Sequence, residues 1–301
     1  MEAEEIELYV KAGKIAKAVV DIARSYVKKG ARLLDICENL ESEIARLGGK
    51  PAFPVNIAIN HIAAHYTPFI GDDTRVPDGS LVKVDVGAHV NGRIADVAVT
   101  VDVGSEYGEL IVAAEEALDK ALEKIAPKVR IVDISTVIEK TIKYYGFKPI
   151  VNLTGHELSP YVIHAGTTIP NVWSPDLAIS SARFEPGHVY AIEPFVTVKN
   201  ALGEVENGPG STIYRLIKAK SSKGFEAIFN FIHENYRTLP FAQRWIERSF
   251  GKRGVELLNR MVYERMVMEY PVLIEKSRGP VAQAEHTVLI TDKEVLVTTL
   301  N

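Results

Sequence analysis

Residues 81–100 read LVKVDVGAHVNGRIADVAVT, with β-branched residues on both sides of Asn91-Gly92. Asn-Gly between alternating apolar residues is a strong signal for a β-hairpin with a two-residue turn. Such a turn pairs Asp85 with Ala98 and makes Asp96 a diagonal neighbour of Asp85 on one face, about 7 Å away or less. Two ionised carboxylates this close in apolar strands repel each other unless a proton or a cation lies between them.

Amphipathic helices are predicted on both sides of this hairpin. Apolar residues recur at spacings of three and four through the first 30 residues, which end in Lys28-Lys29-Gly30, a typical helix C-terminus. The other helices are expected over Asp35–Leu47, from Ser105 as N-cap to Pro127, and over Asp133–Tyr145.

The order helix, helix, strands therefore occurs twice, and the residues repeat with it. Residues 35–51 match residues 133–149 without a gap, at a constant offset of 98 positions, from a shared Asp-Ile to a shared Lys-Pro. A second match relates Asp85 to Glu193, because each stands six positions after a glycine. Two matches in the same order favour a pseudo-twofold domain with a site between its halves.

We expect one catalytic domain over the whole chain, with halves at about 1–104 and 105–301. The second half is longer because residues 211–270 turn helical and charged between two strand-like stretches, 189–198 and 284–297. We interpret this segment as a helical insertion that packs on the body, since no linker rich in Pro, Gly or Ser flanks it.

Composition narrows the class of protein. The chain has 301 residues, 47% hydrophobic and 25% charged, which is typical of a globular protein with a sizeable core. A net charge of −4 argues against a generally basic DNA-binding or RNA-binding protein. One cysteine, an acidic N-terminal stretch and the absence of a run of about 20 apolar residues predict a cytoplasmic protein without membrane contact.

Further acidic residues stand in apolar stretches, as Asp85 and Asp96 do. Glu193 lies in VYAIEPFV, Glu285 just precedes TVLI, and His156 lies in LTGHEL. Four carboxylates and one imidazole would supply ligands for two divalent ions, which in such pairs stand about 3.5–4 Å apart and share an activated water. These ligand types favour Mn, Fe, Co or Zn.

Two further histidines are candidates for the same site. An offset of 98 from His65 falls one position short of His164, so the two could face each other as pseudo-twofold mates. His61 is close to His65 in the chain and could line the same pocket.

Taken together, these motifs resemble the type II methionine aminopeptidases, a family of pita-bread metallopeptidases. The insertion between Glu193 and Glu285 is what separates type II from type I. The resemblance rests on Phe53-Pro54, Asn60, His65 to Pro68, Lys83 to Gly87, Gly92 to Asp96, Asn152 to His156, Ile163 to Gly166, Pro170, Ala191 to Pro194, and Gln283 to Thr287.

The resemblance implies a ligand set and a fold. Asp85, Asp96, His156, Glu193 and Glu285 would hold two metal ions, with Asp96 and Glu285 bridging them. The fold would be α+β, with two duplicated α/β halves around a curved antiparallel sheet. The short N-terminal region resembles the archaeal form of the family.

The resemblance also implies a reaction, the removal of N-terminal methionine. A metal-bound water would attack the first peptide carbonyl, with Glu193 helping to accept its proton. His164 would stabilise the oxyanion and His65 would contact the substrate near the scissile bond. The methionine pocket would be lined by Phe53, Ile163 and Tyr270, with His61 as a neighbour.

The implied substrates are peptides and nascent chains that begin with methionine, handled by a monomer near the ribosome. Two alternatives stay open at this point. One is a prolidase-like dipeptidase on the same scaffold, although such enzymes carry an additional N-terminal domain. The other is a non-catalytic pita-bread protein that binds RNA or ribosomes, although such relatives lose metal ligands.

Overall fold

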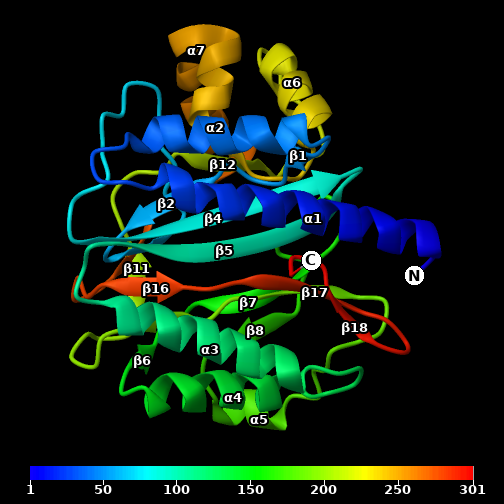
Figure 1. Cartoon of the computed structure of the whole chain (residues 1–301). Coiled ribbons are helices and arrows are strands. Elements are labelled where there is room, and N and C mark those ends of the chain that lie inside the picture. The colour runs from blue at the N-terminus through cyan, green and yellow to red at the C-terminus, as the bar shows by residue number, and fades with distance from the viewer. Residues whose placement is uncertain (301) are drawn as a thin grey trace.

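The computed structural model describes residues 1–300 and has α+β architecture. Two layers of strands meet in the middle of the molecule, with one pair of helices outside each layer (Figure 1). A third group of helices, α6 and α7, lies beyond α2 at one end (Figure 1). No helix within residues 1–300 is long and apolar enough to cross a membrane.

The first half consists of two helices packed on a long hairpin. Its elements are α1 (Ala3–Tyr26), α2 (Leu33–Arg46), β1 (Lys50–Pro51), β2 (Asn56–Ile59), β3 (Ile62–Ala64), β4 (Ser80–Val90) and β5 (Arg93–Val103). Small residues of α1 such as Ala12 and Ala16 are fully buried, which lets the helix approach the hairpin closely. The first helix ends at Tyr26, short of the predicted stop at Gly30.

The predicted hairpin register is confirmed. Asp85 pairs with Ala98, and Gly87 pairs with Asp96. Asn91 and Gly92 have φ values of 49° and 86°, the left-handed conformation that a twisted two-residue turn requires at both positions.

The second half repeats the plan with α3 and α4 outside its strands (Figure 1). Its elements are α3 (Gly108–Lys124), α4 (Ile131–Tyr144), β6 (Lys148–Pro149), β7 (Thr154–Leu158), β8 (Thr168–Pro170), α5 (Pro175–Ile179), β9 (Val189–Ile192), β10 (Phe195–Thr197), β11 (Val205–Asn207), β15 (Leu273–Glu275), β16 (Val281–Gln283), β17 (His286–Ile290) and β18 (Val295–Val297). Ser105 was expected to cap the third helix, but its Oγ accepts from the Tyr107 amide and the helix begins at Gly108.

The segment expected as a helical insertion also contains a small sheet. Helices α6 (Glu226–Tyr236) and α7 (Gln243–Tyr263) are present, with a break at Gly251. Strands β12 (Ile213–Leu216), β13 (Phe241–Ala242) and β14 (Val267–Tyr270) pair in the order β13-β12-β14. The segment therefore combines the predicted helices with a sheet that the sequence did not indicate, and the pairing of β12 with β14 joins its two ends.

The two halves meet along a seam between β5 and the β16–β17 segment. Ala98 and Glu285 form an isolated antiparallel bridge across it. Thr287 Oγ1 accepts from the Asp96 amide at 2.7 Å and donates to the Asp96 carbonyl at 2.8 Å. These contacts fix β5 against β17, so the seam sets the position of acidic side chains from both halves.

Candidate active site

Five side chains predicted as metal ligands line one cavity at this seam. Asp85 lies on β4, Asp96 on β5 and His156 on β7, while Glu193 follows β9 and Glu285 lies between β16 and β17. Asp96, His156 and Glu285 are buried, and Asp85 and Glu193 are half-buried. The structure thus brings together groups from both halves of the chain.

Local backbone features aim these groups at the seam. Pro194 has no N–H to continue a strand ladder, so β9 ends beside Glu193 and a new strand begins at Phe195. The amide of Glu285 donates to the Ala98 carbonyl at 3.1 Å, which ties this residue to the hairpin that carries Asp96.

The polar atoms of the cluster are close enough to share cations. One ligand atom from each of Asp96, His156 and Glu285 lies within 4.8 Å of the others. His156 Nε2 lies 3.4 Å from Glu193 Oε1 and 3.8 Å from Asp96 Oδ2. Within residues 1–300, no lysine or arginine forms an ion pair with any of the four carboxylates.

Burial and mutual repulsion disfavour the charged state of this cluster. Burial raises the pKa of Asp85 to about 7. Burial, followed by repulsion from neighbouring carboxylates, raises the pKa values of Asp96, Glu193 and Glu285 well above their ordinary values. The carboxylates can all be ionised at neutral pH only if positive charge lies among them.

The donor set fits divalent cations. Three buried oxygens, Asp85 Oδ1, Asp96 Oδ1 and Glu285 Oε1, have no hydrogen-bond partner. The side-chain amide of Gln283 also reaches the cluster: its Nε2 lies 3.4 Å from Glu193 and 3.3 Å from Glu285. Unpaired carboxylate oxygens beside a neutral imidazole are the ligands that Mn, Fe, Co and Zn accept.

His65 and His164 line the same cavity and both contact Tyr270. The ring centroids of His65 and Tyr270 are 5.4 Å apart, and those of His164 and Tyr270 are 6.1 Å apart. His164 also contacts His156, with centroids 4.5 Å apart, and is exposed to solvent. Desolvation lowers the pKa values of His65 and His156 to about 4, so both imidazoles are neutral at pH 7.

The model of metallopeptidase family M24 matches residues 7–292. A methionine aminopeptidase of Methanocaldococcus jannaschii is 40% identical over 301 residues, which cover 99% of this chain and 100% of the relative. The chain belongs to metallopeptidase family M24.

Within family M24, the full-length match identifies the chain as an enzyme of the archaeal methionine aminopeptidase group. Two solved structures share its pita-bread fold. A thermophilic Arx1 superposes with a TM-score of 0.85 at 18% identity, covering 99% of this chain and 91% of that one. A methionine aminopeptidase of Thermotoga maritima has a TM-score of 0.72 at 23% identity, covering 100% and 98%.

The cavity of this M24 enzyme also has an apolar part next to the acidic cluster. The predicted pocket residues Phe53, Ile163 and Tyr270 line it. The structure does not bring His61 there: it lies in the turn between β2 and β3, and its carbonyl accepts from the Glu275 amide. Proximity in the chain to His65 was misleading because the extended strand β3 (Ile62–Ala64) separates the two residues and places them at its opposite ends.

Sequence reasoning missed several residues at the M24 site. Asn56, Ile213 and Pro240 all line the cavity. Asn56 is the β-ladder partner of Asp85, while Ile213 and Pro240 belong to the insertion. Gln283 was quoted only as part of a motif, yet it donates to two of the carboxylates. Its position two residues before Glu285 in an extended segment is the signal that could have identified it.

Proposed function

We propose that the chain removes the N-terminal methionine from peptides and nascent proteins with the help of two divalent cations. One observation carries the proposal: four carboxylates without a cationic partner and one neutral imidazole lie beside an apolar pocket. The naming of the relatives as methionine aminopeptidases supports this choice of substrate.

In this proposal two divalent ions would be held by Asp85, Asp96, His156, Glu193 and Glu285, and Asp96 and Glu285 would be the ligands that both ions share. Their metal would be Co, Mn, Fe or Zn, the choices that this donor set permits. Divalent metal held there would supply a water of lowered pKa and would polarise the scissile carbonyl.

Residues of the chain would carry out proton transfer, oxyanion stabilisation and substrate contact. Glu193 would help to accept the proton of the attacking water, since its carboxylate lines the cavity among the other proposed ligands. A neutral imidazole can donate one ring N–H, and His164 would direct its N–H at the developing oxyanion. His65 would contact the substrate near the scissile bond from the other side of Tyr270.

The shape of the cavity supports an exopeptidase that accepts methionine. The positively charged α-amino group of the substrate would be drawn to the acidic cluster, and an unbranched apolar side chain would enter the pocket beside Phe53, Ile163 and Tyr270. A second cavity shares His65, His156, His164 and Glu193 with the first and extends along Asn152 to Thr154 and Gly166 to Thr168. We assign the rest of the peptide to this second cavity.

Nascent chains supply N-terminal methionine in quantity, so we propose that the enzyme acts in the cytoplasm, close to the ribosome, as a monomer. The relatives named methionine aminopeptidase are the support for these substrates.

The test is hydrolysis of the peptide Met-Ala-Ser, with the dipeptide Gly-Pro and N-acetylated Met-Ala-Ser as comparisons, after addition of Co or Mn. We expect methionine to be released from the free peptide alone, because acetylation removes the charge of the α-amino group. Release of proline without methionine would favour a dipeptidase. No turnover with any metal would favour a binding protein.

A further inference from the structure

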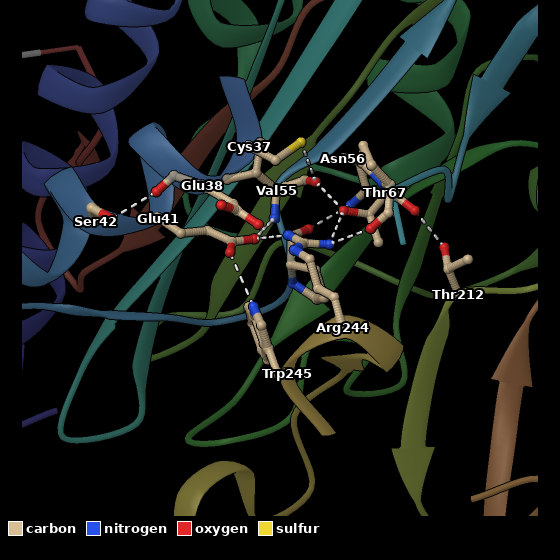
Figure 2. A network of polar contacts seen from close by, with 12 residues as sticks. Cys37, Glu38, Glu41, Ser42, Val55, Asn56, Thr67, Thr212, Arg244 and Trp245 are labelled. Atoms are coloured by element: carbon tan, nitrogen blue, oxygen red, sulfur yellow. Dashed lines mark hydrogen bonds and ion pairs between the residues drawn. The ribbon is translucent and has the colours of Figure 1, made fainter. Parts of the chain in front are cut away.

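A buried ion pair joins the first half of the molecule to the insertion. Glu41 on α2 and Arg244 at the start of α7 form this pair, and Trp245 Nε1 donates to the second Glu41 oxygen at 3.0 Å (Figure 2). Arg244 is 0% exposed and Glu41 is 9% exposed. A buried ion pair adds little net stability compared with well-packed apolar side chains, so stability alone does not account for it.

The ion pair contacts both ends of one segment, residues 55–68, which we call the His65 hairpin. Its first leg begins at Val55 and its second leg ends at Pro68. Glu41 Oε1 accepts from the Val55 amide at 3.1 Å on the first leg. On the second leg, Arg244 Nη1 donates to Thr67 Oγ1 at 2.7 Å (Figure 2). It also donates to the Pro68 carbonyl at 3.0 Å. Thr67 Oγ1 donates in turn to the Val55 carbonyl at 2.7 Å, which ties the two legs together.

His65 stands two residues before Thr67 in a conformation that needs such support. Its φ is 62°, in the left-handed region that residues other than glycine seldom adopt. The insertion makes a second contact on the same leg, because Thr212 Oγ1 donates to the Thr67 carbonyl at 2.6 Å. Without these contacts the backbone at His65 could relax and move the imidazole out of the cavity that it lines.

We propose that Arg244 is a positioning residue that acts through His65. Its planar guanidinium spans Glu41, Thr67 and Pro68 at once, so it fixes the second leg of the His65 hairpin relative to α2. The insertion thereby sets the orientation of a side chain that faces the scissile bond, and this inference rests on the role of His65 in the proposed function.

The test uses two variants, each made with His65 present and with His65→Ala. Glu41→Gln combined with Arg244→Met removes both charges, so that neither is left buried alone. Thr67→Val keeps the ion pair and removes only the hydroxyl that Arg244 contacts. With His65 present, we expect kcat/KM on Met-Ala-Ser to fall on the order of tenfold at unchanged metal content, because small misplacements of catalytic groups are costly. With His65→Ala, the fall should be less than about twofold, since coupled residues are non-additive.

The matched control is Ile138→Ala, which opens a cavity under α4 in the other half of the molecule. It should lower the melting temperature and leave kcat/KM unchanged. Equal losses with and without His65, no loss in either variant, or a comparable loss in Ile138→Ala would each overturn the proposal.

A second measurement separates this proposal from the proposed function. In NMR spectra of protein labelled with ¹³C-histidine, the signals that disappear in His65→Ala belong to the His65 ring. These signals should shift in Thr67→Val and in the double variant Glu41→Gln with Arg244→Met, and they should stay in place in Ile138→Ala. Unchanged signals overturn the positioning role even if the wild-type protein hydrolyses no peptide. A wild-type protein that is inactive but shows the shifts contradicts only the proposed function.

Discussion

At the scale of single residues, Glu285 shows most directly how charge and metal binding are connected. Its Oε1 has no hydrogen-bond partner, and repulsion from Asp96 and Glu193 adds to the effect of burial on its pKa. Glu285→Gln keeps the shape and removes the charge. We therefore expect a folded protein that loses at least one metal ion and at least about 100-fold in kcat/KM. Elemental analysis, circular dichroism and Met-Ala-Ser turnover measure the three quantities.

The control for this change is Glu185→Gln, on the surface, where the carboxylate pairs with Lys128. It should alter neither metal content nor turnover. If Glu285→Gln retains two ions and full activity, the bridging role assigned to Glu285 is wrong.

His164 makes a different prediction, because we assign it to the oxyanion and not to the metals. His164→Ala should lower kcat on the order of 100- to 1000-fold, as the loss of one oxyanion donor does elsewhere. Metal content should stay close to that of the wild type. Loss of both ions in this variant would show that His164 is a ligand.

The residues that could be predicted from the sequence were those whose type conflicts with their surroundings. A carboxylate such as Asp96 is unusual between valines and alanines, which marks it as a candidate for function. The position of the hairpin turn then predicted that Asp85 and Asp96 lie close together. Asn56 raised no such conflict, and only the pairing of β2 with β4, which the sequence does not specify, brings it beside Asp85.

At the scale of elements, predictability depended on length and on local signals. The hairpin of β4 and β5 could be predicted because its eleven-residue strands flank one Asn-Gly turn. Strand β13 has only two residues, and it pairs with β12, more than twenty positions away. Such short strands have too few residues to show a periodicity, so the sequence indicated the helices of the insertion and not this sheet.

The turn after β15 allows a pH prediction outside the metal site. Burial of Glu275 opposes its ionisation, but hydrogen bonds from the amides of Gly203, Ser277 and Gly279 outweigh this and lower the pKa of its carboxyl. A lowered pKa stabilises the fold above the ordinary value of 4.5, and this stabilisation is lost as the pH falls below it.

We therefore expect Glu275→Gln to be destabilised by about 1–3 kcal/mol at pH 7, since an amide cannot accept all these bonds. The difference from the wild type should shrink as the pH falls from 5 to 3. Urea unfolding of both proteins at several pH values measures it. A difference that is constant or grows toward pH 3 would contradict the assignment.

At the scale of the whole molecule, the two halves are joined at the point where the proposed metal ligands converge. A cation that binds the folded state alone stabilises it, by about 2.7 kcal/mol per site at a free concentration 100 times Kd. Removing the ions with a chelator should therefore lower the melting temperature, by roughly 5–10 °C for a chain of this size. Differential scanning calorimetry with and without chelator, followed by metal re-addition, tests this.

The chelator should have a much smaller effect on Glu285→Gln, because we expect this variant to bind fewer ions. An identical melting curve for the wild type with and without chelator would count against a shared metal site. The pseudo-twofold plan behind this site could be predicted from the repeat at an offset of 98 positions. The closure of the seam by Thr287 could not, because the sequence does not reveal contacts between distant strands.

The spread of the proposed ligands along the chain has a consequence for biosynthesis. Asp85 and Glu285 line one cavity although they are two hundred positions apart, which makes the site strongly non-local. At translation rates of about 5–20 residues per second, Glu285 is synthesised on the order of 10–40 s after Asp85. During this interval the hairpin carries Asp85 and Asp96 without the later ligands of the proposed set. We therefore expect each new copy of the enzyme to bind its metal only after nearly all of its own chain has been made.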